Sequence, residues 1–338
     1  MTINWPGGKR LEDLNHDDPR WLERRQEFIG ASEIAGMMGI GKYGSPASVY
    51  LNKVGAVVDI DNEAMALGRG MEDEILRHVV NVALDVEGGG SSPTYVHDTE
   101  PRMTATPDGW VKHSDGRLST IEIKFTASRT AVAEWTAMQE WLAGDAGAFP
   151  TGTAVEGYYV QIQAQMEVLD VDDGYLCVCI GERAALKLQL KLDVTDDEVR
   201  ILRIKRDREL GAMMVKSVSA FWSRYVDAGV CPATTDEDLE ALRKAWPVAA
   251  EGSSVTRREL KGLVRKWEHD KAKSKEFDKK ARAKEARIRA SIGTAETVDL
   301  GGGYVMTAKT TRRNNKAREA STSEFRTLRV KAPKRGTA

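Results

Sequence analysis

A hairpin signal near the middle of the chain constrains the fold more than any other feature of the sequence. The turn 113–116 contains Asp-Gly and separates the extended segments 110–112 and 118–125, which is a strong short-range signal for a β-hairpin. Successive side chains of a strand point to opposite faces of its sheet. The second strand therefore directs its isoleucines and phenylalanine into a core, whereas Glu122 and Lys124 lie side by side on the opposite face, for chemistry or for a salt bridge.

A third charged residue precedes this hairpin. Asp108 lies in the sequence Thr-Pro-Asp-Gly at 106–109. Metal-dependent phosphodiester cleavage needs hard oxygen ligands, and Mg²⁺ prefers carboxylate, carbonyl and water oxygens. Asp108 and Glu122 would supply carboxylates and the backbone of Ile123 a carbonyl, while Lys124 would orient or deprotonate the attacking water and stabilise developing charge. The alternative interpretation is a surface Glu–Lys pair with a turn aspartate.

The composition is that of a soluble globular protein. Of 338 residues, 41% are apolar and 30% charged, and this length predicts two domains, or one domain with an extension. No segment approaches the roughly 18 apolar residues of a membrane span, and the N-terminus lacks a signal-peptide segment. Three scattered cysteines and five scattered histidines form neither a disulfide framework nor a zinc site, which fits a reducing cytoplasm. We expect no membrane partner.

The net charge of −1 conceals a division along the chain. Residues 255–338 contain 24 Lys plus Arg against 10 Asp plus Glu, a net +14, so the first 254 residues carry a net −15. A basic tail on an acidic body indicates an anionic partner, of which nucleic acid is the leading class. The alternative is a solvated lysine-rich helix that binds nothing.

The pattern of apolar residues and turn signals predicts a mixed α/β body and a charged helical extension. We expect a polar lead-in over 1–20, a main domain over 21–232 and a basic extension over 236–338. The glycine-rich segment 88–93 is expected to break the chain, and 298–309 to form a hairpin around a triple glycine. The predicted helices span 21–38 (broken around Gly30), 46–54, 64–84, 130–141, 158–169, 196–226, 236–246 and 255–292, and the predicted strands span 95–105, 110–112, 118–125, 175–180 and 185–192.

Two predicted helices carry further polar candidates. Glu72 follows Gly68 by one turn, and a glycine there would let another backbone approach, so that Glu72 reaches the acidic site. Gln161 and Gln165 share one helix face, where a glutamine can position water or a phosphate oxygen. Taken singly, each is more often a solvated surface residue.

Arg25 and Ser32 are candidates for an anion site. Ser32 opens a predicted helix, whose free amides together with a hydroxyl and an arginine can bind a phosphate. The alternative is a serine that only caps the helix.

Together these motifs resemble a known family. Arg25-x6-Ser32, Gly68-x3-Glu72, the Thr-Pro-Asp-Gly at 106–109, Glu-Ile-Lys at 122–124 and Tyr-Tyr-Val-Gln-Ile-Gln at 158–163 occur in the same order as in the YqaJ-like viral recombinases. That family includes the phage lambda exonuclease and uses the PD-(D/E)xK restriction-endonuclease-like fold. The similarity covers about residues 21–180 and continues more weakly to about 232.

The resemblance implies a fold with a mixed central sheet flanked by helices. It also implies a Mg²⁺-dependent exonuclease, with Mn²⁺ as a possible substitute, that digests one strand of linear double-stranded DNA from its 5′ end in a bacterial host cytoplasm. The 3′ single strand would pass to a single-strand annealing protein for recombination. A homo-oligomer, by resemblance a ring of three, would explain processivity.

The resemblance also assigns roles to individual residues. It implies metal ligands at Glu72, Asp108, Glu122 and the Ile123 carbonyl, with Lys124 as the catalytic lysine. The remaining implied roles are a supporting role for Gln161, a 5′-phosphate pocket made by Arg25, Ser32 and Thr106, and an acidic position near the site at Asp98. Thr106 replaces a serine of the lambda enzyme and keeps the hydroxyl.

Several motifs and the overall pattern also have alternative interpretations. Residues 36–43 approach a P-loop, but a tyrosine stands at the Ser/Thr position and a predicted helix precedes the loop; Gly39, Gly41 and Gly44 likewise mimic a dinucleotide loop. We expect a helix-ending turn there. An endonuclease of the same superfamily, or a non-catalytic DNA-binding or annealing protein of the same fold, remains the alternative function. A Cas4-like nuclease would need a cysteine cluster, which the sequence lacks.

Overall fold

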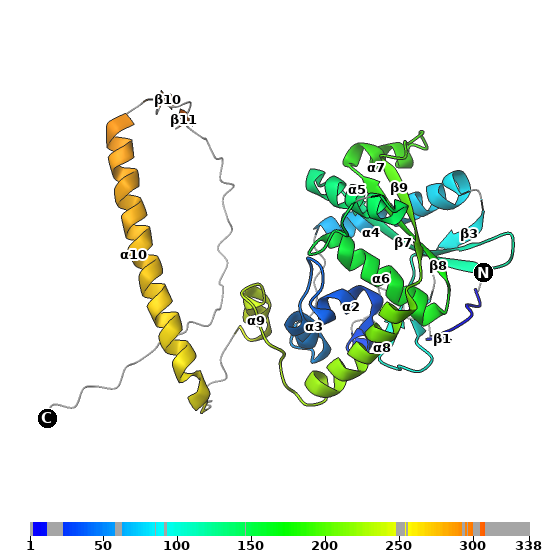
Figure 1. Cartoon of the computed structure of the whole chain (residues 1–338), viewed down its shortest axis with the longest axis horizontal. Coiled ribbons are helices and arrows are strands. Elements are labelled where there is room, and N and C mark those ends of the chain that lie inside the picture. Colours follow the sequence, from blue (N-terminus) through cyan, green and yellow to red (C-terminus); the bar gives the residue numbers. More distant parts are fainter. Residues whose placement is uncertain are drawn as a thin grey trace, which may run out of the picture. The chain divides into compact units, whose positions relative to one another are not determined.

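The structure is a computed structural model, and it describes residues 3–11, 23–57, 63–84, 86–90, 93–145, 147–247, 254, 256–292, 295, 297–299 and 305–307. The chain divides into two compact units, Met1–Trp246 and Pro247–Ala338, and each is described by itself. Figure 1 shows the first unit as a sheet with helices on both sides. Over the described part of the chain, no helix is both long and apolar enough to cross a membrane.

A five-stranded mixed sheet forms the centre of the first unit, in the order β3-β6-β7-β8-β9. The strands β7 and β8 pair in parallel, and the other neighbours pair antiparallel. The hairpin predicted around 113–116 is confirmed as β6 and β7. The strands are β3 (Glu87–Gly90), β6 (Gly109–Lys112), β7 (Leu118–Thr126), β8 (Asp173–Ile180) and β9 (Val199–Lys205).

A second, smaller sheet has the order β1-β4-β5-β2. Its strands are β1 (Lys9–Arg10), β2 (Ile29–Gly30), β4 (Tyr95–Val96) and β5 (Met103–Ala105). The parallel pairing of β2 with β5 places Gly30 opposite Thr104. This pairing brings the segment of Arg25 and Ser32 next to the segment that leads to Asp108.

Helices cover both faces of the five-stranded sheet. One face contributes Leu176, Val178 and Leu202 to a core with α2, α5, α6 and α8, and the other packs its apolar side chains against α4 and α7. The predicted mixed α/β class is therefore confirmed. The helices are α2 (Ala31–Met38), α3 (Pro46–Lys53), α4 (Glu63–His78) with the π-helical turn η1 (Val79–Ala83), α5 (Arg129–Ala143), α6 (Ala154–Leu169), α7 (Glu182–Gln189), α8 (Arg208–Phe221) with the π-helical turn η2 (Trp222–Val226), and α9 (Leu239–Ala245).

Of the glycine-rich segment 88–93 that was expected to break the chain, residues 88–90 belong to the edge strand β3, so the prediction was wrong for them. Residues 91 and 92 lie outside the described residues. A Cβ on Gly88 would lie 2.6 Å from the carbonyl oxygen of Trp110, and one on Gly90 would overlap the Leu76 side chain of α4. Glycine permits this close approach of strand and helix, and a strand glycine often marks such a site.

The segment 185–192 was predicted as a strand and is helical in the structure. Ala184, Ala185 and Leu188 of α7 are buried, whereas Leu186 and Leu190 are exposed. Burial at intervals of three and four residues is the helical period. Leucines at every second position from 186 to 192 misled the prediction, because only Leu188 of the four is buried.

The long helix predicted over 196–226 was also wrong in its first third. Residues Val199–Lys205 form β9, which pairs along its length with β8. Helix α8 begins only at Asp207, whose side chain accepts hydrogen bonds from the amides of Glu209 and Leu210. The capping box expected at Thr195 closes a turn, in which the Thr195 amide donates to Glu198 at 2.9 Å.

The predicted strand over 95–105 is in fact the hairpin of β4 and β5, joined by a turn. In the expected polar lead-in, Trp5 is buried and stacks edge-on against Tyr95, and β1 pairs with β4. Residues 12–20 lie outside the described residues. The short helix α9, expected in the extension, belongs to the first unit, where Asp238 accepts a hydrogen bond from Ser45.

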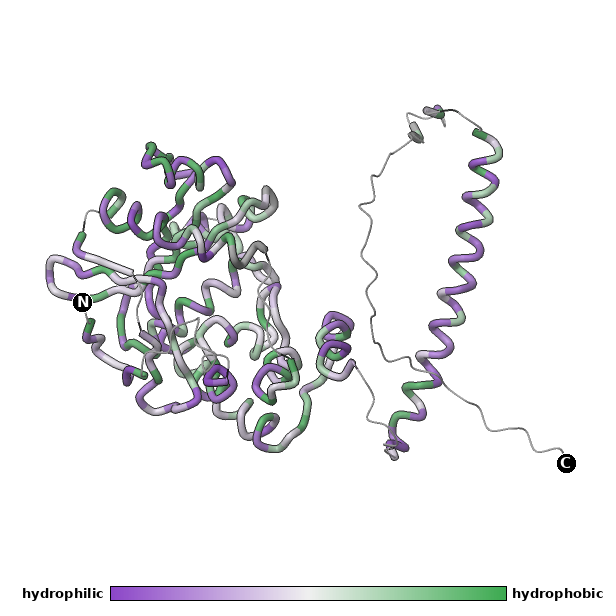
Figure 2. The backbone as a smooth tube through the Cα atoms, turned by 180° about the vertical axis from the view of Figure 1, so that it is seen from behind, coloured by the Kyte–Doolittle hydropathy of each residue, from purple (hydrophilic) through white to green (hydrophobic). Residues whose placement is uncertain are grey.

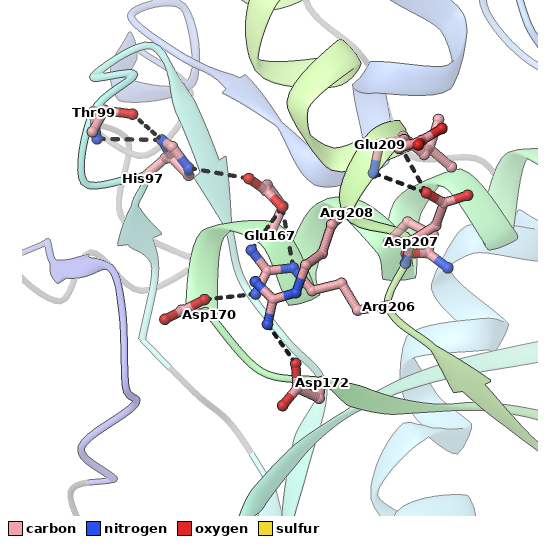
Figure 3. A network of polar contacts seen from close by, with 11 residues as sticks. His97, Thr99, Glu167, Asp170, Asp172, Arg206, Asp207, Arg208 and Glu209 are labelled. Atoms are coloured by element: carbon pink, nitrogen blue, oxygen red, sulfur yellow. Dashed lines mark hydrogen bonds and ion pairs between the residues drawn. The ribbon is translucent and has the colours of Figure 1, made fainter.

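A polar network joins the two sheets of the first unit (Figure 3). Glu167 on α6 accepts two hydrogen bonds from Arg206, at 3.1 and 2.8 Å, and its other oxygen lies 3.7 Å from His97 in the β4–β5 turn. Arg206 also donates to Asp170 at 2.6 Å. The His97 ring accepts from the Glu100 amide. These contacts fix the β4–β5 hairpin to α6 and to the end of β9.

The described residues of the second unit include the long helix α10 (Lys261–Ile292), which is preceded by the 3-10 turn η3 (Arg258–Leu260). None of its side chains is buried, and Figure 2 shows α10 as predominantly hydrophilic. Strands β10 (Thr297–Asp299) and β11 (Val305–Thr307) pair antiparallel, as expected for the hairpin over 298–309. The triple glycine between them lies outside the described residues.

Candidate active site

Glu122 is the hub of a buried polar cluster. It lies in the middle of β7 and is 1% exposed. Its Oε1 accepts hydrogen bonds from Lys124 and, at 2.5 Å, from Gln161 Nε2, while its Oε2 accepts one from Gln165 Nε2 at 2.5 Å. Thr120 donates in turn to Gln165 Oε1 at 2.9 Å. The three partners of Glu122, and Thr120, lie on β7 or on α6, which covers this face of the sheet.

The alternation of β7 produces this arrangement. Ile121 and Ile123 are buried in the core on the side of α4 and α7, so Glu122 and Lys124 point to the opposite side, toward α6. On α6, Gln161 and Gln165 are four residues apart and therefore share the face that meets the strand. A buried carboxylate needs partners, and the two glutamines and the lysine supply them.

Asp108 is bound to the same strand through its backbone and side chain. Its amide donates to the Ile121 carbonyl at 3.1 Å, and its Oδ2 accepts from the Ile123 amide at 2.7 Å. Burial, followed by the negative charge of Glu122, raises the pKa of the Asp108 carboxyl well above its ordinary value, while Lys124 and the Ile123 amide oppose the rise.

Glu72 approaches the cluster from α4. Burial raises the pKa of the Glu72 carboxyl; the charge of Lys124 opposes the rise, and that of Glu122 adds to it. The same carboxyl contributes to the raised pKa of Asp108. Glu72, Asp108 and Glu122 therefore act on one another electrostatically, although their residues are far apart in the sequence.

Lys124 is the cationic member of the cluster. Burial lowers the pKa of its ammonium, but the charges of Glu122 and Asp108 outweigh burial, so its pKa is raised overall. Its Nζ lies 5.0 Å from the centre of the Tyr158 ring on α6. Lys124 is thus held between the carboxylates and an aromatic face, and it remains 23% exposed.

The cluster fits a hard divalent cation in its charge and donor type. The three carboxylates outnumber the one lysine, and carboxylate oxygens are the donors that a hard divalent cation prefers. Burial is the largest cause of the raised pKa values of Glu72 and Asp108, and the charge of Glu122 adds to both. As the described side chains stand, no group of three His, Cys, Asp or Glu is arranged to hold a metal. Glu122 instead binds its lysine and glutamine donors, which it would exchange in part for an ion.

The three expected phosphate-binding residues come from adjoining segments. Ser32 lies exposed in the first turn of α2, and the Arg25 guanidinium lies 3.8 Å from Glu33 in the same turn, 33% exposed. Thr106 is exposed just after β5, where its hydroxyl lies 2.7 Å from that of Thr94. The pairing of β2 with β5 places these segments side by side.

One other expectation is corrected, and another is confirmed. A Cβ on Gly68 would meet no atom of the described residues within 4 Å, so none of them packs closely against this glycine. Asp98 is exposed in the β4–β5 turn, where it accepts from the Gly8 amide at 3.3 Å; it anchors the N-terminal segment. The P-loop-like residues form the predicted helix-ending turn, with Gly39 in the left-handed conformation at φ 70°.

Several residues around the site carry no clear signal in the sequence. Tyr158 belongs to the Tyr-Tyr motif, but the motif does not reveal that its ring covers Lys124 and stacks on Trp135 at 6.0 Å. Lys53 and Glu33 form a buried ion pair beside Arg25. A lysine at the end of a short helix looks solvated in the sequence, and no local pattern reveals a partner 20 residues away.

Comparisons with known proteins agree with the motifs. Residues 20–172 match the model of the YqaJ-like viral recombinase domain. No curated protein matches the sequence.

Among solved structures, the chain is similar to the alkaline exonuclease LHK-Exo from Laribacter hongkongensis, in its complex with dAMP. The identity is 23% and the TM-score 0.44, and the match covers 67% of this chain and 96% of that chain. A phage related exonuclease from Haemophilus somnus 129PT has 11% identity and a TM-score of 0.42, over 60% and 96%. The shutoff and exonuclease protein of the Kaposi's sarcoma associated herpesvirus has 7% identity and a TM-score of 0.36, over 63% and 70%.

The ordered motifs, the mixed sheet and the family match agree. Residues 20–172 of this chain are therefore similar to the YqaJ-like viral recombinase domain.

Proposed function

We propose that this chain is a Mg²⁺-dependent exonuclease that degrades one strand of linear double-stranded DNA from the 5′ end, with Mn²⁺ able to replace Mg²⁺. The observation that carries the proposal is the buried carboxylate of Glu122, held by Lys124, Gln161 and Gln165, with Asp108 bound to the same strand. The 3′ strand that remains would serve a single-strand annealing protein.

The proposed metal ligands are the carboxylates of Glu72, Asp108 and Glu122 and the carbonyl of Ile123. A bound Mg²⁺ supplies Lewis-acid stabilisation of phosphate oxygens and makes an attacking water more acidic. These ligands would hold the cation in a mostly buried site, where electrostatic interactions are stronger than in water.

The other residues act on the phosphate and on the ligands. The Lys124 ammonium would donate to the attacking water or to a phosphate oxygen and stabilise the developing negative charge. Gln161 and Gln165 would keep the Glu122 carboxylate in one orientation, because each binds one of its two oxygens. Such fixed geometry is a large part of catalysis in phosphoryl transfer.

The choice of a 5′ end would depend on the pocket of Arg25, Ser32 and Thr106. An arginine, two hydroxyls and the amides that open α2 are the donors that a terminal phosphate monoester accepts. The charge of an arginine beside free helix amides favours an anion. Processive digestion would follow if three copies enclose the duplex in a ring, and the mass of the protein in solution tests this assembly.

One assay tests the proposal. The purified chain is incubated with linear and circular duplex DNA, labelled at either end where linear, in Mg²⁺ or in excess chelator. We expect linear DNA to lose label progressively from the 5′ end in Mg²⁺ only. Cleavage of circular DNA would identify an endonuclease instead, and intact DNA that nonetheless binds the protein would identify a non-catalytic binding protein.

A further inference from the structure

A buried ion pair joins the last residue of α3 to the first turn of α2. The Lys53 side chain is fully buried, and its ammonium donates to both carboxylate oxygens of Glu33, at 2.8 and 2.7 Å. Glu33 is itself only 12% exposed at its side chain. Neither residue belongs to the metal-binding cluster around Glu122, and neither has a role in the function proposed above.

The same pair holds the backbone on which the phosphate pocket is built. Lys53 Nζ also donates to the carbonyl oxygen of Arg25 at 2.8 Å. Glu33 Oε2 accepts from the Gly30 amide at 2.9 Å and so caps the start of α2, where Ser32 lies. A single ammonium therefore contacts the segment of Arg25 directly and the start of α2 through Glu33.

Glu33 has two cationic neighbours, and they differ in distance. Its carboxylate lies at hydrogen-bond distance from Lys53 but 3.8 Å from the Arg25 guanidinium. Arginine binds carboxylates and phosphates with the same planar donors. An unneutralised Glu33 would consequently compete with a phosphate for Arg25 and would also repel the phosphate directly.

We propose that Lys53 is a positioning residue for 5′-phosphate recognition, because it neutralises Glu33 and thereby leaves Arg25 free to bind the terminal phosphate. The proposal rests on the proposed function, of which the Arg25 pocket is a part. With Lys53 and Glu33 paired, Arg25 provides a net positive charge at a site where its side chain is 33% exposed. Without Lys53, Arg25 is the cation that Glu33 would attract.

The test compares cleavage of linear duplexes that carry a 5′-phosphate or a 5′-hydroxyl. For K53M we expect the ratio of kcat/KM for phosphorylated ends to kcat/KM for hydroxyl ends to fall by about tenfold or more, because a charge-assisted contact to the phosphate is lost. The loss should appear as a higher KM for phosphorylated ends, with kcat at saturation unchanged. The double variant E33Q/K53M should recover the ratio, because the competing carboxylate is then neutral.

The matched control is K187M. Lys187 also donates to both oxygens of one glutamate, Glu198, at 2.7 and 2.8 Å, but it lies on α7, which packs on the other face of the sheet. Its loss should leave the phosphate ratio unchanged. Thermal unfolding of all variants reports whether each one is folded.

The outcomes separate this inference from the proposed function. A wild-type ratio retained in K53M, or a ratio lost in K53M and not recovered in E33Q/K53M, contradicts the positioning role. If K53M does not fold, the variant E33Q tests the inference instead, because it keeps the hydrogen bond from Lys53 to the Arg25 carbonyl. We expect E33Q to bind phosphorylated ends more tightly than the wild type, and unchanged binding would overturn the inference. Equal wild-type rates on both ends would refute the pocket itself, and absence of any cleavage would refute the proposed nuclease.

Discussion

Gln165 donates from Nε2 to Glu122 Oε2 at 2.5 Å, across the contact between α6 and β7. Both residues are buried, and Thr120 fixes the amide of Gln165 by donating to its oxygen. The other oxygen of Glu122 is bound by Gln161 and Lys124. The orientation of this carboxylate is thus determined by residues of two elements, which is the support that a precise catalytic site requires.

Replacing Gln165 with leucine should therefore impair both stability and cleavage. Hydrogen bonds to charged groups contribute roughly 1.5–3 kcal/mol, so we expect Q165L to lower the free energy of unfolding by about that amount and to lower kcat at saturating DNA. The control is Q163L on the same helix, because Gln163 is equally buried and binds the Lys205 carbonyl at 2.8 Å, away from Glu122. Equal loss of kcat in both variants would show that Gln165 has no specific role.

Replacing Lys124 with alanine should abolish digestion and leave DNA binding nearly intact. A group that stabilises or moves charge in the transition state contributes roughly 10²–10⁴-fold to the rate, and we expect a loss of that order in single-turnover cleavage. The control K112A removes a lysine of the neighbouring strand, which pairs with Glu87 at 3.2 Å on the surface. Retained cleavage in K124A would remove this lysine from the mechanism.

The Glu167 network predicts a pH dependence of stability. The ring of His97, 3.7 Å away, and the hydrogen bonds from Arg206 hold the pKa of the Glu167 carboxyl below its ordinary value. A lowered pKa means that the folded state favours the ionised form, so its stabilisation is present above the unfolded pKa near 4.5 and is lost as the pH falls through the lower folded value.

We therefore expect E167Q to be less stable than the wild type at pH 7. The difference should shrink below about pH 4.5. Chemical denaturation of both proteins across this range measures the effect. A difference that does not depend on pH would mean that the ionised carboxylate contributes nothing to the fold.

Deleting residues 255–338 should weaken the salt dependence of DNA binding. This segment carries a net +14, and α10 exposes its charged side chains. Each phosphate contact contributes a slope of about −0.9 to the plot of log affinity against log salt concentration for duplex DNA. The expected result is a shallower slope for the shortened chain, and an unchanged slope would place the tail off the DNA.

Local signals in the sequence were sufficient for the hairpin of β6 and β7. The Asp-Gly turn and the alternation from Leu118 to Phe125 are short-range features, and the structure has both strands with Ile121 and Ile123 inside. The helix face shared by Gln161 and Gln165 was likewise evident from their spacing of four residues. Glu72 was expected at the acidic site from its spacing to Gly68 and from the family resemblance. No local pattern encodes the contact between α4 and β7.

Tertiary contacts overruled local preference where the predictions were wrong. The segment of β9 contains Val199, Ile201 and Ile204 within a charged sequence that also fits an amphipathic helix, and pairing with β8 decides the outcome. The glycines of β3 resemble a chain break in the sequence. In the structure, Leu76 and Trp110 occupy the space that side chains at these positions would need. The pairing of Lys53 with Glu33 depends on how α3 meets α2, which the sequence pattern does not specify.

Titration calorimetry of the wild type and of D108N with Mg²⁺ or Mn²⁺, without DNA, measures whether Glu72, Asp108 and Glu122 bind one shared cation. We expect saturable binding to the wild type and binding weakened at least about tenfold in D108N, which loses one of the proposed carboxylate ligands. Equal binding to the two proteins, or no binding to the wild type alongside metal-dependent cleavage, would contradict this expectation.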